Sequence, residues 1–473
     1  MHINDFPPEV IRSVLTRVPR GSLIPASLVC KAWRSAALPL LYWSVRMFSI
    51  ADNPNLEGLL DLSRFENHPK DLLERIIREA NDDGLGFQLS HCVRHLNVAW
   101  NMDHQQLQHF GAAVSKMKNL EHLNWIVSVL NETKWHDILV RMHQELPNLR
   151  SLSLAIAQNE IPLGDSEEVV SLVNLKQLTI SFDEKIDEEP EEHMPTTITK
   201  LICGAHNIES LTLDLQVDES FEEYPPPDNW GLDSMFLALS LHHFPHLHEL
   251  FIGSHYRRTS LECFNGADSG LQRLLRNQQH LQKIVLYICG RGSEAGFTIS
   301  PLDMGETMPA IRHFGGPVLM IEVLLKSRLA GQLEVLEIIQ LENIQGSNLS
   351  DLLQELDNLT TELPSLRGLS ISTNGDGTFN NTSNALLLLA KLIPRAPVLE
   401  ELVISTIQHP TVENKEGLLE ILVQLPRLRV VSLGWWLPLL DKLPGTQTFS
   451  ERVKALCPGL MITSGVEFSS NLA

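Results

Sequence analysis

"LRSLSL" (149–154) and "LKQLTI" (175–180) share a six-residue pattern in which the first, fourth and sixth positions are apolar. Nine further segments follow the same pattern, with small departures: "VRHLNV" (93–98), "LEHLNW" (120–125), "IESLTL" (208–213), "LHELFI" (247–252), "LQKIVL" (281–286), "LEVLEI" (333–338), "LRGLSI" (366–371), "LEELVI" (399–404) and "LRVVSL" (428–433). Successive copies begin 26 to 39 residues apart, except for one interval of 52 residues between Leu281 and Leu333. We expect a degenerate copy there, around "IRHFGG" (311–316). A repeat of near-constant length predicts an array of one small structural unit.

Each copy predicts a short strand, because alternation sends the fourth and sixth side chains to one face and the fifth to the other. The segments between copies have helical periodicity. In "NETKWHDILVRMHQEL" (131–146) one helical face would carry Trp135, Ile138, Leu139 and Met142, and further helices are expected within 233–244 and 347–363. A unit of one strand and one helix cannot bury its own apolar face, so neighbouring units must stack into a curved solenoid.

The pattern resembles the leucine-rich repeat, although its units are longer than in the commonest classes and lack the Asn or Cys that usually follows the strand. The resemblance implies parallel strands on the concave face of the solenoid and helices on the convex face.

The fifth position of each copy is predicted to point out of the concave face. These residues are Asn97, Asn124, Ser153, Thr179, Thr212, Phe251, Val285, Glu337, Ser370, Val403 and Ser432. Two interpretations of these residues are open. They can be residues that are simply compatible with a strand, or they can form a weakly charged surface that binds a protein. We predict target contacts at Phe251, Tyr287, Glu337 and Trp435, three of them aromatic, because aromatic residues are enriched at binding hot spots. Of Trp435 and Trp436, which follow the last copy, one is expected to cap the core and the other to be exposed.

The first 46 residues have a different, helical period. An apolar stripe is formed by Val10, Ile11, Val14, Leu15 and Val18. Pro7 and Pro8 favour a helix start, and "PRGS" (19–22) separates this helix from the next, which Ser22 is predicted to cap. Two adjacent rows are expected on a further helix: Leu28, Ala32 and Ala36, and Val29, Trp33 and Ala37. Three short helices bury little apolar surface, which favours a module completed by a partner.

This stretch, "FPPEVIRSVLTRVPRGSLIPASLVCKAWRSAALPLLYW" (6–43), resembles the F-box, the motif that docks on Skp-family adaptors. Residues 6–9 fit its opening "LPxE", with Phe6 in place of Leu; "SLVCKAW" (27–33) fits "xLVCkxW" and "PLLYW" (39–43) the closing turn. The resemblance implies adaptor binding by Phe6, Pro7, Pro8, Val10, Ile11, Leu15, Leu23, Leu28, Val29 and Trp33. Cys30 reads as a small apolar filler on a helix.

The predicted fold class is therefore α/β: a three-helix F-box domain (1–47), a helical connector (48–90) and a leucine-rich-repeat domain (91–473). In the connector, Leu72, Leu73, Ile76 and Ile77 are expected to pack against the first repeat.

The resemblance implies a substrate-recognition subunit of an SCF-type ubiquitin ligase, which contacts the cullin and RING subunits through the Skp-family adaptor. Such a protein is not an enzyme and contributes proximity. The alternative is a scaffold that binds partners through the same two parts without promoting ubiquitination.

Composition limits the other classes. The formal net charge of −21 argues against a general nucleic-acid binder, because an acidic surface repels phosphate. Two acidic segments, 183–193 and 218–228, are typical of solvated loops. The six cysteines are scattered, the first residues do not resemble a secretory signal, and no apolar run reaches eighteen residues. We expect a cytoplasmic or nuclear protein without a membrane partner.

No sequence motif indicates a cofactor, a metal or a catalytic site. Four histidines lie close together in "LHHFPHLHEL" (241–250), but in the repeat register they fall on both sides of a turn, which favours solvated residues over metal ligands. "NGDGTFNNTSN" (374–384) lacks the spaced acidic ligands of a calcium loop.

Overall fold

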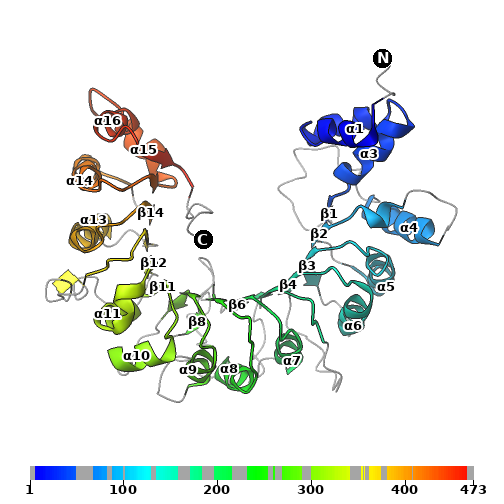
Figure 1. The fold of residues 1–473 in the computed structure, drawn as a ribbon, viewed down its shortest axis with the longest axis horizontal. Coiled ribbons are helices and arrows are strands. Elements are labelled where there is room, and N and C mark those ends of the chain that lie inside the picture. The colour runs from blue at the N-terminus through cyan, green and yellow to red at the C-terminus, as the bar shows by residue number, and fades with distance from the viewer. Residues whose placement is uncertain are drawn as a thin grey trace. The chain divides into compact units, whose positions relative to one another are not determined.

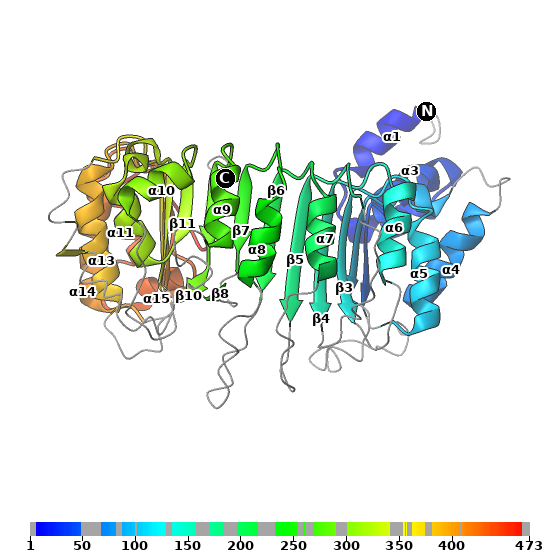
Figure 2. The same cartoon turned by 90° about the horizontal axis from the view of Figure 1, so that it is seen from below.

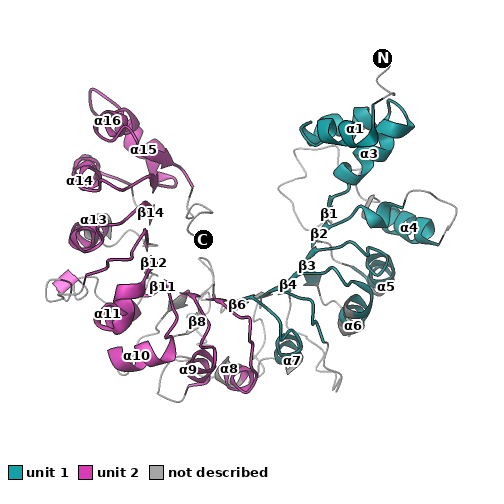
Figure 3. Ribbon diagram, viewed as in Figure 1, with its two compact units in different colours: residues 1–211 teal, residues 212–473 magenta. Residues whose placement is uncertain are grey.

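The computed structural model describes most of the chain. The described residues are 6–48, 68–81, 88–99, 102–128, 135–157, 171–183, 196–215, 232–253, 259–260, 269–289, 300–340, 353–354, 356, 362–373, 381–406 and 409–465. They form two compact units, residues 1–211 and 212–473, which are described separately (Figure 3).

Unit 1 begins with three helices and continues with alternating strands and helices (Figure 1). Its helices are α1 (Pro8–Leu15), α2 (Arg20–Ser27), α3 (Lys31–Leu41), α4 (His68–Ala80), α5 (His104–Val114), α6 (Trp135–Glu145) and α7 (Thr196–Gly204), with a short 3-10 helix at Leu89–His91. Its strands are β1 (Ser44–Phe48), β2 (His95–Ala99), β3 (His122–Ser128), β4 (Ser151–Ala157) and β5 (Gln177–Asp183). The division between the units falls within β6 (Ser210–Leu215).

Unit 2 repeats the alternation. Its strands are β7 (Glu249–Ile252), β8 (Thr259–Ser260), β9 (Lys283–Leu286), β10 (Ile288–Cys289), β11 (His313–Gly316), β12 (Val335–Gln340), β13 (Gly368–Thr373), β14 (Glu401–Thr406), β15 (Val430–Ser432) and β16 (Met461–Thr463). Its helices are α8 (Leu232–Ser240), α9 (Gly270–Asn277), α10 (Pro301–Thr307), α11 (Val318–Lys326), α13 (Asn381–Leu392), α14 (Val412–Val423), α15 (Trp436–Lys442) and α16 (Phe449–Leu456), with 3-10 turns at Arg328–Gln332 and Ile393–Arg395.

The strands of each unit pair in parallel and in sequence order. Unit 1 has the order β1-β2-β3-β4-β5 and unit 2 the order β7-β9-β11-β12-β13-β14-β15-β16, while β8 and β10 form a separate pair. The repeat pattern sets the register: Leu96, Leu123, Leu152 and Leu178 are direct neighbours on β2 to β5, and each is at most 2% exposed. Helices cover one face of the strands in each unit (Figure 2), which confirms the predicted α/β repeat fold.

Asparagine side chains join consecutive repeats near the turns that lead into several of the strands. Asn119 donates from Nδ2 to the carbonyl oxygen of His91 at 2.8 Å, and Asn148 donates to Lys118 in the same way at 2.9 Å. Asn207 repeats the contact at 2.9 Å, and Asn277, the last residue of α9 in unit 2, makes a similar bond to the Ser240 carbonyl oxygen at 2.7 Å. These asparagine clamps satisfy carbonyl groups that no helix or strand uses.

The residue just before a strand is often charged and pairs with the residue at the equivalent position of the next repeat. In unit 1, Lys176 contacts Glu209 at 2.7 Å. In unit 2, Glu400 lies between Arg367 at 3.0 Å and Arg429 at 3.7 Å. Neighbouring repeats therefore present opposite charges along this edge, and each of these exposed pairs contributes little energy.

The predicted helices at 131–146 and 233–244 are confirmed as α6 and α8, and the degenerate copy at 311–316 as β11. Ile138, Leu139 and Met142 are buried as expected, while the side chain of Trp135 and most of 347–363 lie outside the described residues. Strands β1 and β16 were not predicted, because "SVRMF" and "MIT" lack the leading apolar residues of the pattern.

Candidate docking surfaces

The three N-terminal helices enclose a small core of their own. Ile11, Leu15, Leu23 and Ala37 are its buried members, each at most 4% exposed. Six partly buried side chains surround them: Val18, Ala26, Trp33, Ala36, Leu40 and Leu41. Pro7 precedes α1 and Pro8 is its first residue, so the predicted proline start is confirmed. The core has few members, as expected for a module of this length.

The boundary between α2 and α3 differs from the prediction. Helix α2 begins at Arg20 with Pro19 at its N-cap, so Ser22 lies inside the helix and does not cap it. Cys30 is extended, with φ −161° and ψ 173°, and precedes the first residue of α3. Leu28 and Val29 therefore lie in the link between the helices and do not continue the α3 rows. The prediction missed this break because it extended the helical period from Ala32 back through Cys30.

This break exposes apolar side chains. Leu28 is 70% exposed, Val29 58% and Ile24, one helical turn before Leu28, 59%. On α1, Val10 is 44% and Val14 49% exposed. Together with Phe6, at 40%, these six residues form what we call the apolar docking set. Six large apolar side chains exposed within residues 6–29 indicate an interaction site.

The predicted adaptor-binding residues separate into two groups. Phe6, Pro7, Pro8, Val10, Leu28 and Val29 are exposed, whereas Ile11, Leu15 and Leu23 are buried in the core and hold the helices together. Trp33 is half-buried, and its indole N–H has no hydrogen-bond partner in the described part of the chain. Val14 and Ile24 were missed as surface residues. Their spacing of four residues from Val10 and Leu28 is the signal that would have found them.

The F-box helices lead directly into the first strand. The carbonyl oxygen of Trp43 accepts hydrogen bonds from the backbone N–H groups of Arg94 and His95, both at 3.0 Å. Arg20 on α2 donates to the carbonyl oxygens of Leu41 and Ser44. The Arg94 guanidinium lies 4.9 Å from the centre of the Trp43 ring. The module is therefore attached to β2 through β1.

Two imidazoles extend this junction along the strands. The rings of His95 and His122 are stacked, with centroids 4.3 Å apart and an interplanar angle of 6°. The pKa of His122 is lowered, first by burial and then by the positive charge that His95 carries when protonated; nearby Glu121 opposes the shift and Arg150 adds to it. Burial and the stack together therefore favour the neutral form of His122.

Helix α4 of the predicted connector packs as expected on the start of the repeats. Leu73 and Ile76 are at most 2% exposed, and the Glu79 carboxylate accepts a hydrogen bond from the Leu89 N–H at 2.9 Å. Burial raises the pKa of the nearby Cys92 thiol to about 11, so this cysteine is unreactive at neutral pH.

The open face of unit 2 is more apolar than predicted. Phe251, Val285, Tyr287 and Ile339 form one cluster, in which Val285 is 2% and Tyr287 9% exposed. Lys283 adds a contact, with its ammonium 5.1 Å from the centre of the Phe251 ring. Glu337 pairs with His313 on the neighbouring strand. Because Tyr287 is buried, it offers a partner little surface, whereas Phe251 and Glu337 remain partly exposed.

Several other predicted outward residues are also buried. Val403 and Ser432 are each 2% exposed and Ser370 is 7% exposed, whereas Asn124 of unit 1 is exposed as expected. One cause is visible at Gly315, which lies between Val285 and Glu337 on adjacent strands. A Cβ atom there would lie 2.9 Å from Val285 Cγ1, so the neighbours close over the glycine. Strand alternation predicts which face a side chain points to, but it does not predict whether side chains on the adjacent strands cover it.

The tryptophan pair divides as predicted. Trp436 is 1% exposed and Trp435 38% exposed. Trp435 meets His409 edge to face, with ring centroids 5.5 Å apart. Trp436 is the first residue of α15 and Trp435 is its N-cap, while β15 stops earlier, at Ser432.

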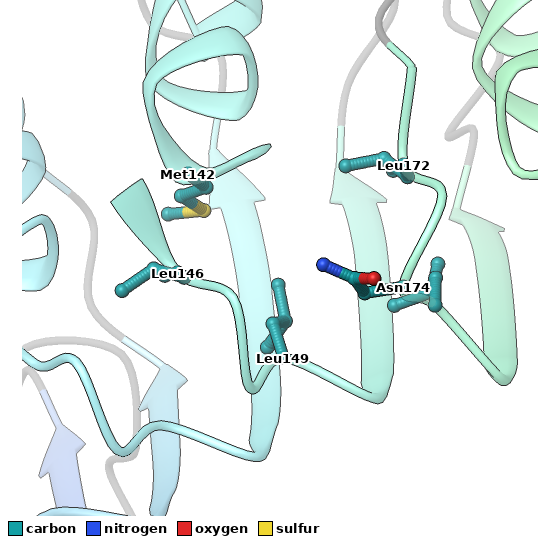
Figure 4. Close-up of a pocket in the computed structure, with 6 residues that line it drawn as sticks. Met142, Leu146, Leu149, Leu172 and Asn174 are labelled. Atoms are coloured by element: carbon teal, nitrogen blue, oxygen red, sulfur yellow. The ribbon is translucent and has the colours of Figure 1, made fainter. Parts of the chain in front are cut away.

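Unit 1 also contains a pocket on its helix side, between α6 and the turn before β5 (Figure 4). It is shallow and open to solvent, and it is lined by Met142, Leu146, Leu149, Leu172, Asn174 and Leu175. The amide of Asn174 is the one polar side chain in this lining. The pocket lacks the converging polar groups of a specific small-molecule site.

His242, His243 and His246 are exposed, and His248 donates from Nδ1 to the carbonyl oxygen of His246 at 3.0 Å. Among the described residues no three His, Cys, Asp or Glu side chains converge as a metal ion would require. No helix in the described part of the chain combines the length and apolar character needed to cross a bilayer. The acidic segments 183–193 and 218–228 lie outside the described residues, except Asp183.

Residues 3–44 match the sequence model of the F-box domain. The match includes helices α1 to α3 and ends at the first residue of β1. It indicates an adaptor-binding domain and no catalytic one. No curated protein matches the chain. Among solved structures, a chain in the crystal structure of the Rad7 and Elc1 complex in yeast is similar at 13% identity and a TM-score of 0.40, over 92% of this chain and 94% of that one. This likeness is too low to support a functional argument.

Proposed function

We propose that this protein is the substrate-recognition subunit of an SCF-type ubiquitin ligase, with the F-box bound to a Skp-family adaptor and the repeats bound to a protein target. The observation that carries the proposal is an F-box domain whose six-residue apolar docking set is exposed. Burial of such a set against a partner is favourable, because each large apolar side chain removed from water contributes about 1.5–3 kcal/mol.

The repeats supply the second half of the proposal. Their open strand face in unit 2 presents Phe251 packed under Lys283, with the Glu337–His313 pair nearby. An aromatic anchor beside fixed charges of both signs is the kind of surface that protein partners use. The target contacts are therefore expected around Phe251 and Glu337, with Trp435 as a separate exposed aromatic residue on the same unit.

In this role the protein performs no bond chemistry. By holding a target near a ubiquitin-conjugating enzyme, it raises the effective concentration of the two reactants. We place this activity in the cytoplasm or the nucleus. Cys30, Cys92, Cys203 and Cys457 are free thiols, as expected for a protein of a reducing compartment.

The direct test is co-purification of the full-length chain with a Skp-family adaptor, using Ile24→Asp with Leu28→Asp. Both side chains are exposed, so the double variant should keep its melting temperature and lose about a hundredfold or more in affinity. Leu241→Asp with Leu302→Asp is the matched control, since these leucines are 82% and 71% exposed in unit 2. Equal binding by both double variants would contradict adaptor docking through this surface.

Recovery of the cullin separates the ligase from the scaffold. A complex that contains the adaptor, the cullin and the RING subunit supports the ligase role. An adaptor complex from which the cullin is absent at saturating concentration favours the scaffold. Phe251→Ala, which leaves the F-box unchanged, should then reduce capture of targets without changing adaptor binding.

A further inference from the structure

The F-box differs from the rest of the chain in charge. Residues 6–48 contain six basic side chains and one acidic side chain, Glu9, although the whole chain has a formal net charge of −21. All six basic side chains are exposed: Arg12, Arg17, Arg20, Lys31, Arg34 and Arg46. A strongly acidic protein has thus concentrated positive charge on one small module.

Four of these cations, Arg12, Arg17, Lys31 and Arg46, have no side-chain hydrogen bond or ion pair with a described residue. Arg20 donates to the carbonyl oxygens of Leu41 and Ser44, and Arg34 donates to that of Ser27. Arg17 and Lys31, by contrast, make no side-chain hydrogen bond or ion pair with any described residue. Exposed long side chains without a partner retain their rotamer freedom, so the fold does not explain their presence.

Arg17 and Lys31 also lie at the ends of the apolar docking set. Val10, Val14 and Arg17 follow one another at spacings of four and three residues, and the Arg17 N–H donates to the Val14 carbonyl oxygen at 3.1 Å. These spacings place the three side chains on one face of α1 and its last turn. Lys31 begins α3, directly after the extended Cys30 that follows Leu28 and Val29. Arg17 therefore continues the α1 row, and Lys31 is separated from Val29 by one residue along the chain.

From this arrangement we propose that the F-box recognises a partner surface that is apolar at its centre and carries carboxylates opposite Arg17 and Lys31. The inference rests on the proposed function and adds the electrostatic character of the adaptor surface. Because a rim charge acts mainly before the apolar surfaces meet, its effect falls on the association rate and on salt dependence. The apolar set instead controls how long the complex lasts.

The positive charge of the F-box also affects how a partner approaches the chain at long range. A partner that carries carboxylates is repelled at long range by a chain of net charge −21, and the positive module offsets this repulsion locally. Screening shortens this attraction to about 8 Å at physiological ionic strength, so the effect is largest at low salt.

The test measures association and dissociation rates of full-length Arg17→Glu with Lys31→Glu and a purified Skp-family adaptor, at low and at physiological ionic strength. We expect association to slow by about tenfold at low salt, with a smaller change at physiological salt and little change in the dissociation rate. The matched control is Arg427→Glu with Lys454→Glu, two exposed residues of unit 2 that give the same change in net charge.

The outcomes separate the two proposals. Association that is equally fast in the Arg17/Lys31 variant, or equally slow in both variants, overturns the proposed role of these two cations. In that case tight binding of the wild-type chain still supports adaptor docking. If the wild-type chain fails to bind the adaptor at any ionic strength, the proposed function fails together with this inference.

Discussion

In the F-box, six large apolar side chains are at least 40% exposed, whereas the apolar positions of the repeat pattern on β12, β13 and β14 are at most 1% exposed. Both regions are built from short elements, although the F-box contains only helices and the repeats alternate strands with helices. A repeat gains apolar cover from the repeat on each side, but three helices have no such neighbour. The difference shows that the F-box has apolar surface available for a partner because its fold cannot bury it.

The largest effect is expected when one buried leucine is replaced in each region. Leu15→Ala and Leu402→Ala both change side chains that are fully buried, and each should cost about 2–5 kcal/mol. In the F-box this loss is comparable to the stability of the whole module, so hydrogen exchange over α1 to α3 should increase strongly and adaptor binding should fail. In unit 2 the exchange should increase only near β14. Equal loss of protection in both regions would contradict the comparison.

A second test concerns crowding on the open strand face. Gly315→Ala places a Cβ atom 2.9 Å from Val285 Cγ1 and 3.2 Å from Glu337 Cβ, and should reduce the free energy of unfolding by roughly 1–3 kcal/mol. Gly417→Ala, in the middle of α14, meets only Leu386 Cδ1 at 3.7 Å and should instead stabilise by about 0.5–1 kcal/mol. Denaturant unfolding measures both. Adding Val285→Ala to Gly315→Ala should restore part of the loss.

The junction between the two regions should depend on pH. Because the pKa of His122 is lowered in the folded chain, folding favours its neutral form. The resulting stability is fully present above the ordinary histidine pKa of 6.5 and is lost as pH falls through the lower, folded pKa. Protection of β2 and β3 from hydrogen exchange should therefore decrease between about pH 7 and about pH 5. His95→Gln, which removes the neighbouring imidazole, should raise the pKa of His122; an unchanged titration by NMR would contradict this cause.

The smallest expected effect concerns the charged edge. Glu400→Gln removes the carboxylate between Arg367 and Arg429 and should cost about 0.5 kcal/mol, less in high salt. The pKa of Glu400 is lowered chiefly by the hydrogen bond from Arg367, so the wild-type pair should also weaken in acid. A loss as large as that of Leu402→Ala would mean that charge, and not burial, holds the repeats together.

The sequence predicted the repeat fold because apolar spacing determines which side chains can be buried together. It located β11 in the wide interval, although that copy departs from the pattern. Strands β1 and β16 were missed because their sequences lack the apolar residues that begin the repeat pattern. They form because their backbones pair with β2 and β15. Pairing between segments distant in sequence leaves no periodic signal within either one.

The candidate surfaces were less predictable than the fold. The F-box motif identified the module, but motif residues serve both its core and its surface, and only packing separates Leu15 from Leu28. On the repeats, strand alternation predicted that Val285 and Val403 point out of the open face. Both side chains are nevertheless buried, each at 2% exposed, because neighbouring side chains cover them. Lateral cover depends on the sizes of side chains on adjacent strands, which a single copy of the pattern does not contain.

The asparagine clamps have a consequence for how such a chain can change in length. Asn119 and Asn148 each bind a carbonyl group of the preceding repeat and no residue further away. If one whole repeat were excised or duplicated, the flanking clamps would still meet an equivalent turn. The backbone contact at Trp43 follows the same rule, because its carbonyl oxygen accepts from Arg94 and His95 just as the Arg94 carbonyl oxygen accepts from Glu121 and His122. The array is therefore modular along its length, and its first repeat joins the F-box through the contact that the later repeats use among themselves.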